Sequence, residues 1–403
     1  MKPVLTCDAP WIAAPALQSV MACLNDNSHL PTAMMVGGAV RDAVRGSMAP
    51  PTDIDIATTL LPDHVMGRAA KAGLGVHPTG LAHGTVTLVC DKIPFQVTTL
   101  RRDMATDGRH AVVDFTQDWH EDAARRDFTM NTLLMDAAGH VYDPLGTGID
   151  DARQGNIVFV GDPAQRIQED ALRLLRFYRF WATHGHIDRP PTPDVTAALR
   201  QSASMLAHLS AERISAEVTK ILASDQALFI LERMFLNNVL ADYPRAADWH
   251  KTVAAAIAIP DPAFGTVPLR YWALLPDTDT EMGDKRYLVM TRKLAQQIAA
   301  YRDGLTVLQN TDFAPVSLHR CAYHYGAAVT RDLCRMFGRD DRDVPGTIPA
   351  FPLRAADVQA VCGASGAALG QILKGAENQW IDSGFTLDRA ALLRPLGVRG
   401  QGH

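Results

Sequence analysis

The pattern of apolar residues changes once along this chain, near Asp162, and this change limits the folds open to it. Before the change, short runs typical of β-strands alternate with turns, and after it the apolar residues follow the helical period. The strand-like runs begin at residues 33, 52, 84, 95, 111 and 132 and read AMMVGG, TDIDIAT, GTVTLVC, FQVTTL, AVVDF and TLLMDAAGHVYD. The pattern therefore predicts an α/β head followed by an all-helical remainder.

The helical part begins with GDPAQRIQEDALRLLRFYRFWATHG at 161–185. Asp162 suits the N-cap, Pro163 the first helical position and Gly185 the stop, so this segment is expected to form one helix. Further helical runs follow at 210–224, 227–240, 285–304 and 355–384. Segments rich in proline and glycine at 188–193, 259–268 and 343–352 are candidate joints.

Composition restricts the partners and the compartment. The net charge is −5, whereas a protein that binds nucleic acid through bulk charge alone would be basic, so any such binding must use local patches. The six cysteines form no CxxC pair, which indicates reduced thiols in a cytoplasmic protein. The beginning of the sequence lacks a signal-peptide layout. The longest uncharged stretch there, 9–25, is interrupted by Pro10 and Pro15, so no membrane span is expected.

Two aspartates, Asp53 and Asp55, flank one isoleucine in TDIDIAT. Along a strand the side chains alternate faces, so both carboxylates project from one face, roughly 6 to 7 Å apart at their Cβ atoms. Ile54 and Ile56 then point to the other face, into a core. Two oxygen donors at this spacing suit Mg²⁺, and two-metal phosphoryl or nucleotidyl transfer needs such a carboxylate pair. The alternative is an exposed polar face on which both acids are merely solvated.

A pair of glycines precedes this strand, in MMVGGAVRDAVRG at 34–46. Gly37 and Gly38 let the backbone approach a ligand closely, and the N-terminus of the helix that follows favours an anion. Arg41, one turn into that helix, could reach a phosphate. A glycine turn and helix followed by a strand with DxD predict a triphosphate-binding turn beside a metal site.

These motifs carry a family resemblance. GGAVRD followed by DIDIAT resembles the head of the nucleotidyltransferases related to DNA polymerase β, and more narrowly the class II branch of tRNA CCA-adding enzymes and bacterial poly(A) polymerases. The resemblance continues in order through HGTVTLV at 83–89, TLRRDMATDGRHAVVDF at 99–115, RRDFTMNTLLMD at 125–136 and EDALRLLRFYRF at 169–180. The helical remainder carries weaker motifs.

The resemblance implies an α+β fold with a polymerase-β-like nucleotidyltransferase head and a mixed sheet at 1–160. It also implies a nucleotide-selecting helical neck at 161–225 and a helical body and tail at 226–403 that bind tRNA. The implied reaction is template-independent addition of C, C and A to the 3′ end of tRNA from CTP and ATP, with release of pyrophosphate. Mg²⁺ is the implied cofactor, held by the catalytic Asp53 and Asp55. Basic residues of the tail that could contact tRNA are Lys285, Arg286, Arg292, Lys293, Arg389, Arg394 and Arg399.

The motif RRDFTMN contains three further candidates. The resemblance places Arg126 toward the nucleotide, with Asp127 and Asn131 near the sugar. Spacing alone does not imply these roles, because an Arg–Asp ion pair on a surface loop would give the same pattern and contribute little energy.

The segment EDALRLLRFYRF offers a protein template for the base. Asp170 could accept a hydrogen bond from the exocyclic amine of cytosine or adenine, and Arg173 could donate to ring acceptors. Uracil and guanine would present a carbonyl to the carboxylate and be rejected. Glu169 would brace Arg173. The resemblance also places Arg176 and Arg179 near the nucleotide. The alternative is a charged helix face with ordinary i,i+3 and i,i+4 ion pairs.

Two features bear on the completeness of the reaction. The loop at 99–115 resembles a mobile loop that helps the family switch from C to A addition, although an ordinary long hairpin connection also fits. In the family a third acid often comes from a segment like FEVTTLR, where this chain has Gln96. A glutamine supplies an amide oxygen without charge, so metal binding would rest on Asp53 and Asp55.

Four other functions stay open. A bacterial poly(A) polymerase shares the head motifs, but the chain lacks a long basic C-terminal extension and its charge is negative. A CC-adding enzyme would leave the final A to a partner. A tRNA-binding protein with weakened catalysis is suggested only by Gln96. A small-molecule nucleotidyltransferase would need neither the EDxxR segment nor the long helical tail.

Overall fold

A mixed sheet of eight strands forms the N-terminal part of the computed structural model, which describes residues 1–25, 30–102, 114–239 and 289–398. Its strand order is β1-β10-β9-β2-β3-β6-β5-β4, and only β3 and β6 run parallel. The strands are β1 Leu5–Thr6, β2 Ala33–Val36, β3 Asp55–Thr58, β4 Gly75–Gly80, β5 Thr85–Cys90, β6 Ile93–Thr99, β9 Leu134–Met135 and β10 His140–Tyr142. A separate two-stranded ladder pairs β7 Arg101–Arg102 with β8 Asp114–Phe115.

The strands expected from the sequence are confirmed in the described residues, except that β3 begins later than expected; strands β1, β4 and β7 were not expected. β3 begins at Asp55, so Asp53 lies just before the strand. The edge strand β4 has the sequence GVHPTG, which carries no apolar alternation. A register shift lies between His77 and Gly80, around Pro78, as is usual for proline at a sheet edge.

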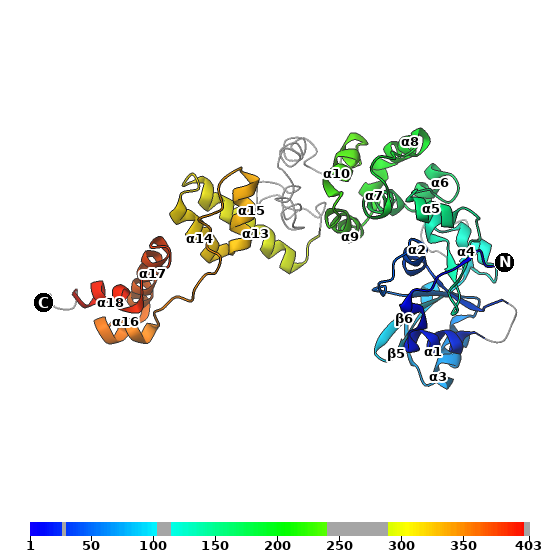
Figure 1. Cartoon of the computed structure of the whole chain (residues 1–403), viewed down its shortest axis with the longest axis horizontal. Helices are drawn as coiled ribbons and strands as arrows, with labels where there is room; N and C mark the ends of the chain where they lie inside the picture. The colour runs from blue at the N-terminus through cyan, green and yellow to red at the C-terminus, as the bar shows by residue number, and fades with distance from the viewer. Residues whose placement is uncertain (26–29, 103–113, 240–288, 399–403) are drawn as a thin grey trace. The chain divides into compact units, whose positions relative to one another are not determined.

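Helices cover the sheet. Helices α1 Pro15–Leu24 and α3 Pro62–Lys71 lie together and contact strands β2, β4, β5 and β6 (Figure 1). A second apolar cluster joins Met34 and Val36 to Ala57 and to Trp119 of α4 Trp119–Ala124. Val36 is the register partner of Asp55, so this cluster occupies the face that also bears Asp55.

Helices follow the sheet, and one prediction for them is wrong. The expected single helix at 161–185 is two helices, α6 Pro163–Glu169 and α7 Leu172–His184. Asp170 is extended, with φ −151° and ψ 106°, and its carboxylate accepts the N–H of Leu172 at 3.1 Å. This local bond competes with helix continuation. The predicted Asp162 cap and Gly185 stop are confirmed.

An aromatic core joins the sheet domain to these helices. Phe128 and Phe159 form an isolated β-bridge, and their ring centroids are 5.0 Å apart. Phe177 of α7 stacks on Phe159 at 5.6 Å and 7°, and Phe180 meets Phe128 edge-on at 5.1 Å. Such pairs contribute about 0.5–1.5 kcal/mol each beyond area burial. The motif RRDFTMN is thereby held against α7.

The chain divides into two compact units. The first spans Met1–Leu209 and Ser224–Val239 and adds α2 Gly38–Val44, α5 Gly148–Gln154, α8 Pro193–Gln201 and α10 Ala227–Leu236. The second includes α9 Ala211–Leu222 and two apolar clusters. One is formed by α13 Arg292–Gln309, α14 Pro315–Tyr325 and α15 Ala327–Met336, and the other by α16 Ala355–Cys362, α17 Gly366–Asp382 and α18 Arg389–Val398.

The helical runs expected at 210–224 and 227–240 correspond to α9 and α10, and the run at 355–384 is split between α16 and α17. The joints at 188–193 and 343–352 lie between helices, while the joint at 259–268 falls outside the described residues. No helix in the described part of the chain is long and apolar enough to cross a membrane.

Candidate active site

The glycine turn lies directly beside Asp55. Gly37 has φ 72° and ψ −137°, a conformation that side chains rarely adopt, and it caps α2. A Cβ atom placed on Gly37 would be 3.6 Å from Asp55 Oδ2. The turn and the acid therefore share one space, as the two motifs predicted, and this space is left open because Gly37 has no side chain.

Asp53 and Asp55 are both exposed. Asp55 reaches solvent, but neighbouring protein atoms surround part of its carboxyl group, and this partial desolvation raises its pKa; the positive charge of Arg126 opposes this shift, and the negative charge of Asp53 adds to it. Within the described residues no group of three His, Cys, Asp or Glu side chains could hold a metal ion. A carboxylate pair beside an open glycine turn still fits a hard divalent cation that shares its ligands with substrate phosphates.

Gln96 occupies the neighbouring position on the sheet. It is the register partner of Asp55 in the parallel pair β3–β6, and it is exposed. The side chains of register partners leave a sheet on the same face. The amide of Gln96 therefore lies where a third acid was expected.

A chain of hydrogen bonds links the glycine-turn helix to α7. Arg41 is buried and donates from Nη1 to Asn131 Oδ1 at 3.1 Å. Asn131 Nδ2 donates to Asp127 Oδ1 at 3.1 Å, and Arg176 Nε donates to Asp127 Oδ2 at 2.6 Å. Burial alone would raise the pKa of Asp127, but Arg176, Asn131 and the N–H of Phe128 hold this pKa below its ordinary value. Four predicted site residues thus form one network.

Three guanidinium groups gather around the ring of Phe180. Those of Arg41, Arg176 and Arg179 lie 5.2, 5.5 and 4.5 Å from its centroid. Each distance is within cation–π range. The ring therefore faces three guanidinium groups next to the motif RRDFTMN, and two of them, those of Arg41 and Arg176, are also ion-paired with Asp42 and Asp127. Phe180 was not identified from the sequence as part of the site.

Arg126 is held by an acid that the sequence did not reveal. Asp122 is 2% exposed, and its Oδ2 accepts hydrogen bonds from Arg126 Nη2 at 2.8 Å and Nε at 3.2 Å. Its other oxygen, Oδ1, accepts from Arg125 Nη2 at 2.6 Å and Nε at 2.9 Å, and from the N–H of Arg101 at 3.3 Å. The clamp fixes Arg126 near Asp55 and ties it to β7.

Arg173 is braced as predicted. Its Nη1 donates to Glu169 Oε2 at 2.6 Å, and its Nη2 donates to the carbonyl of Arg125 at 3.1 Å. Asp170 lies at the break between α6 and α7, so the expected geometry of Asp170 and Arg173 on one continuous helix is wrong.

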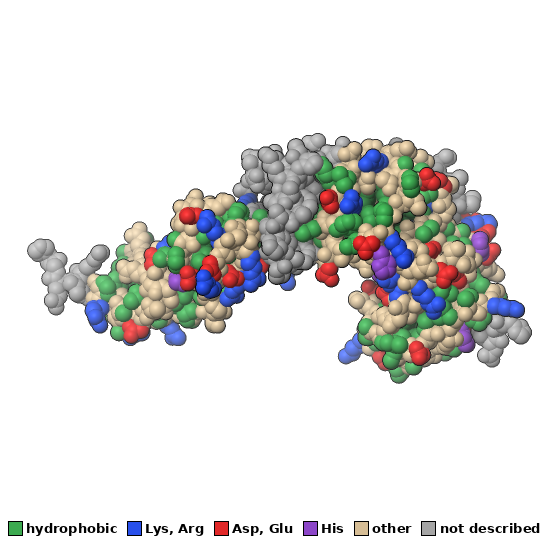
Figure 2. Space-filling view, turned by 45° about the horizontal axis from the view of Figure 1, so that its top comes forward, with side chains coloured by type: hydrophobic (Ala, Val, Ile, Leu, Met, Phe, Trp, Pro, Cys, Tyr) green, Lys and Arg blue, Asp and Glu red, His purple; other side chains and the backbone are tan. Residues whose placement is uncertain are grey.

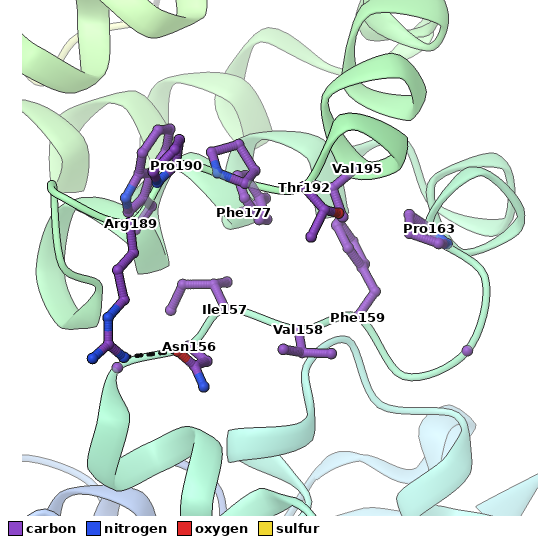
Figure 3. A pocket seen from close by; sticks show the side chains of 14 residues that line it. Asn156, Ile157, Val158, Phe159, Pro163, Phe177, Arg189, Pro190, Thr192 and Val195 are labelled. Atoms are coloured by element: carbon purple, nitrogen blue, oxygen red, sulfur yellow. Dashed lines mark hydrogen bonds between the residues drawn. The ribbon is translucent and has the colours of Figure 1, made fainter.

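A separate pocket of about 260 Å³ lies near this neck (Figure 3). It is bordered by Ile157, Val158 and Phe159 on one side and by Pro190 and Val195 on the other. Its lining contains none of the predicted site residues, and it is mainly apolar.

Comparison with known proteins identifies the family. Residues 33–158 match the family described as "Poly A polymerase head domain", and residues 191–244 match "Probable RNA and SrmB- binding site of polymerase A". The chain is 32% identical over 386 residues to "CCA tRNA nucleotidyltransferase 1, mitochondrial" of Danio rerio, covering 90% of this chain and 86% of the relative. This chain belongs to the CCA tRNA nucleotidyltransferase family. The family resemblance found in the sequence is confirmed.

Other members of the family agree. A "CCA-adding enzyme" of Geobacillus stearothermophilus is 36% identical over 264 residues, covering 65% of this chain and 63% of the relative. The Bacillus stearothermophilus CCA-adding enzyme in complex with CTP superposes with a TM-score of 0.75 at 25% identity, covering 97% and 98% of the two chains. The Thermotoga maritima enzyme complexed with tRNA shares the fold, with a TM-score of 0.68 at 16% identity over 99% and 100%. The predicted α+β fold is confirmed.

Proposed function

We propose that this chain adds C, C and A, in that order, to the 3′ end of tRNA, using CTP and ATP and releasing pyrophosphate. The proposal rests on one connected arrangement: Gly37 lies beside Asp55, and the helix that it caps is hydrogen-bonded through Arg41 to Asn131 of the RRDFTMN motif, whose Arg125 carbonyl accepts a bond from Arg173. A phosphate-binding turn, an acid pair and a candidate base selector are therefore parts of one unit. The CCA-adding names of the relatives support the same reaction.

Asp53 and Asp55 are the residues that would hold Mg²⁺. Proteins of this kind generally use divalent metal ions, and two carboxylates with water and phosphates complete a magnesium shell. When bound, the metal would lower the pKa of the RNA 3′-hydroxyl and neutralise charge on the leaving pyrophosphate. The chain itself contributes the carboxylates and the positive charge of Arg126 beside them.

The triphosphate and sugar would be held by the glycine turn and the network behind it. The N–H groups at Gly37 and Gly38 would face the phosphates at the start of α2, and Arg41 would add charge. Asp127 and Asn131 are buried, so their part in sugar binding would include holding Arg41 and Arg176 in place. Arg126, Arg176 and Arg179 supply the remaining positive charge around the nucleotide.

Asp170 and Arg173 would select the base. Nη1 and Nη2 of Arg173 contact Glu169 and backbone carbonyls, whereas Nε has no hydrogen-bond partner among the described residues. Nε can therefore donate to a ring acceptor, while the Asp170 carboxylate accepts from an exocyclic amine. Both C and A satisfy this pattern, and U and G present a carbonyl to the carboxylate instead.

We assign residues 1–160 to the catalytic head, 161–225 to the neck, and 226–403 to a body and tail that bind tRNA. In the part of the second unit that the structure describes, basic and acidic side chains are mixed (Figure 2). Arg320, Arg339 and Arg389 are paired with acids, whereas Arg292 and Lys293 at the start of α13 have no ion pair among the described residues. These two are the stronger tRNA-contact candidates. Lys285, Arg286, Arg399 and the loop at 103–113 lie outside the described residues.

The test is nucleotide incorporation on one tRNA transcript that ends before CCA, in C, or in CC. Each form receives each nucleotide alone with Mg²⁺, and one set receives CTP with ATP. Growth by CCA followed by a stop, without U or G, is expected. Unlimited addition of A to any 3′ end would instead show a poly(A) polymerase, and a halt after CC would show a CC-adding enzyme. Binding of tRNA without incorporation would show weakened catalysis. The predicted compartment, the cytoplasm, needs a separate localisation experiment.

A further inference from the structure

Arg166 of α6 is a buried arginine that contacts the same groups as Arg173. It is 7% exposed, and its Nη1 donates to Glu169 Oε2 at 2.5 Å. Its Nη2 donates to the carbonyl of Arg126 at 2.8 Å and to the carbonyl of Arg125. Arg173 donates to the same Glu169 oxygen and to the same Arg125 carbonyl. Two guanidinium groups therefore share one carboxylate and one carbonyl.

The contacts form a closed circuit. Arg173 Nη1 also donates to the backbone carbonyl of Arg166 at 3.0 Å, so the two arginines are joined through side chain and main chain. The carbonyls of Arg125 and Arg126, of which the first is shared, follow the last turn of α4, whose C-cap is Arg125. Carbonyls at a helix C-terminus lack helical partners and carry negative partial charge, which favours guanidinium donors. The circuit thus fastens the neck to the end of α4.

The circuit also spans the break between α6 and α7. Arg166 and Glu169 lie on α6, Arg173 lies on the first turn of α7, and the extended Asp170 separates the helices. Across this break, α6 and α7 are joined by the bonds of Arg173 to Glu169 and to the carbonyl of Arg166. The planar guanidinium of Arg166 contacts Glu169 and the carbonyls of Arg125 and Arg126 at the same time. Lysine cannot reproduce this geometry.

We infer that Arg166 is a positioning residue for base selection: it fixes the guanidinium of Arg173 relative to the carbonyls of Arg125 and Arg126. The inference rests on the proposed function, which assigns base selection to Arg173. Arg166 is buried, and it acts by holding Glu169 and the end of α4. Its loss would let Arg173 adopt several orientations, so a wrong base would be rejected less strongly.

Arg166→Lys tests the inference, because it keeps the charge and removes the planar fork. The measurement is kcat/KM for CTP and for UTP on a tRNA that ends before CCA. Discrimination between CTP and UTP is expected to fall about tenfold, equivalent to about 1.4 kcal/mol, while the Kd for tRNA stays unchanged. Arg189→Lys is the control: Arg189 is an exposed arginine that also joins two segments, through Gln154 O and through Asn156 Oδ1, the latter bond being drawn in Figure 3. It should leave discrimination unchanged.

A second variant tests the inference if Arg166→Lys folds poorly. Glu169 is about one-third exposed, so Glu169→Gln should fold, and it weakens the shared acceptor for both arginines. Glu169→Gln should also lower CTP/UTP discrimination. In the double variant, the loss of discrimination free energy should be smaller than the sum of the losses in the two single variants. Unchanged CTP/UTP discrimination in both single variants would overturn the inference.

The proposed function fails separately. If the wild type itself incorporates U as readily as C, base selection at Arg173 is wrong. If the wild type is selective and Arg173→Ala loses selectivity, while Arg166→Lys and Glu169→Gln keep it, the function stands and the inference falls.

Discussion

Gln96 and Asp55 are register partners on the parallel strands β6 and β3, so their side chains leave the sheet side by side. Gln96 is exposed, and its amide makes no hydrogen bond to another described residue. The space beside the acid pair is thus lined by a neutral group at the position where a third carboxylate would add charge.

The first prediction is that Gln96→Glu tightens divalent-metal binding. A third carboxylate adds a charged oxygen ligand beside Asp55, and ligand charge sets cation affinity. We expect the Mg²⁺ concentration for half-maximal CTP incorporation to fall about tenfold, which corresponds to about 1.4 kcal/mol. The Mg²⁺ concentration at which Tm rises should also be lower in Gln96→Glu than in wild type, by a similar factor.

Thr87→Glu is the control for this variant. Thr87 pairs with Gln96 from β5, one strand farther from Asp55. Glutamate at position 87 adds the same charge but does not place it next to the acid pair. The Mg²⁺ dependence of incorporation and of Tm in this variant should therefore stay close to wild type. Equal metal responses of Gln96→Glu and wild type would contradict the placement of Gln96 at the metal site.

The second prediction concerns Gly37→Ala. At φ 72° and ψ −137° any residue other than glycine is strained, at about 1–3 kcal/mol. The added Cβ would also lie 3.6 Å from Asp55 Oδ2, inside the space proposed for phosphates. We expect lower stability in urea unfolding together with a loss of incorporation.

Gly67→Ala is the control, and it is expected to change the stability in the opposite direction. Gly67 lies in the exposed middle of α3, where a Cβ would meet nothing within 4 Å. Alanine there should stabilise the protein by about 1 kcal/mol and leave incorporation intact. Destabilisation by both substitutions to the same extent would show that the conformation of Gly37 is not the cause.

The placement of Asp55 beside the glycine turn could be predicted because both patterns are local. Alternation along a strand places Asp55 opposite Ile56, and a glycine pair marks the turn regardless of distant contacts. The helix break at Asp170 could not be seen, because periodicity continues through it. What ends α6 is a hydrogen bond from the N–H of Leu172 to a single carboxylate.

The clamp at Asp122 was hidden for another reason. In sequence it is one acid in the first turn of a short helix, where acids are common on dipole grounds. Its burial depends on the packing of Arg125, Arg126 and the hairpin strand β7 around it. Such contacts depend on tertiary structure, and no spacing rule specifies them.

The third prediction is that Asp122→Asn strongly destabilises the first unit. The change keeps the shape but leaves the guanidinium groups of Arg125 and Arg126 without their buried countercharge, a loss of about 3–5 kcal/mol. Urea unfolding should show this loss.

Asp118→Asn on the same helix is the control. Asp118 caps α4 by accepting a bond from the N–H of His120, and asparagine caps equally well, so about zero change in stability is expected. Similar losses in both variants would refute the clamp.

The fourth prediction is a pH-dependent contribution from Asp42, which accepts from Arg41 Nε at 2.9 Å and lies 3.5 Å from His184 Nε2. Burial raises its pKa, but hydrogen bonds from His184 and Arg41 outweigh this and hold the pKa at about 2, below the ordinary 3.8. A depressed carboxyl pKa stabilises the folded state above about pH 4, and this contribution is lost as the pH falls toward 2. Asp42 is 44% exposed, so solvent screening limits the effect to about 1 kcal/mol or less.

The variant Asp42→Asn should therefore be less stable than wild type in urea at pH 7. The difference in stability should shrink toward pH 3, and added salt should reduce it. An equal difference at both pH values would show that the charge of Asp42 is not what joins α2 to α7.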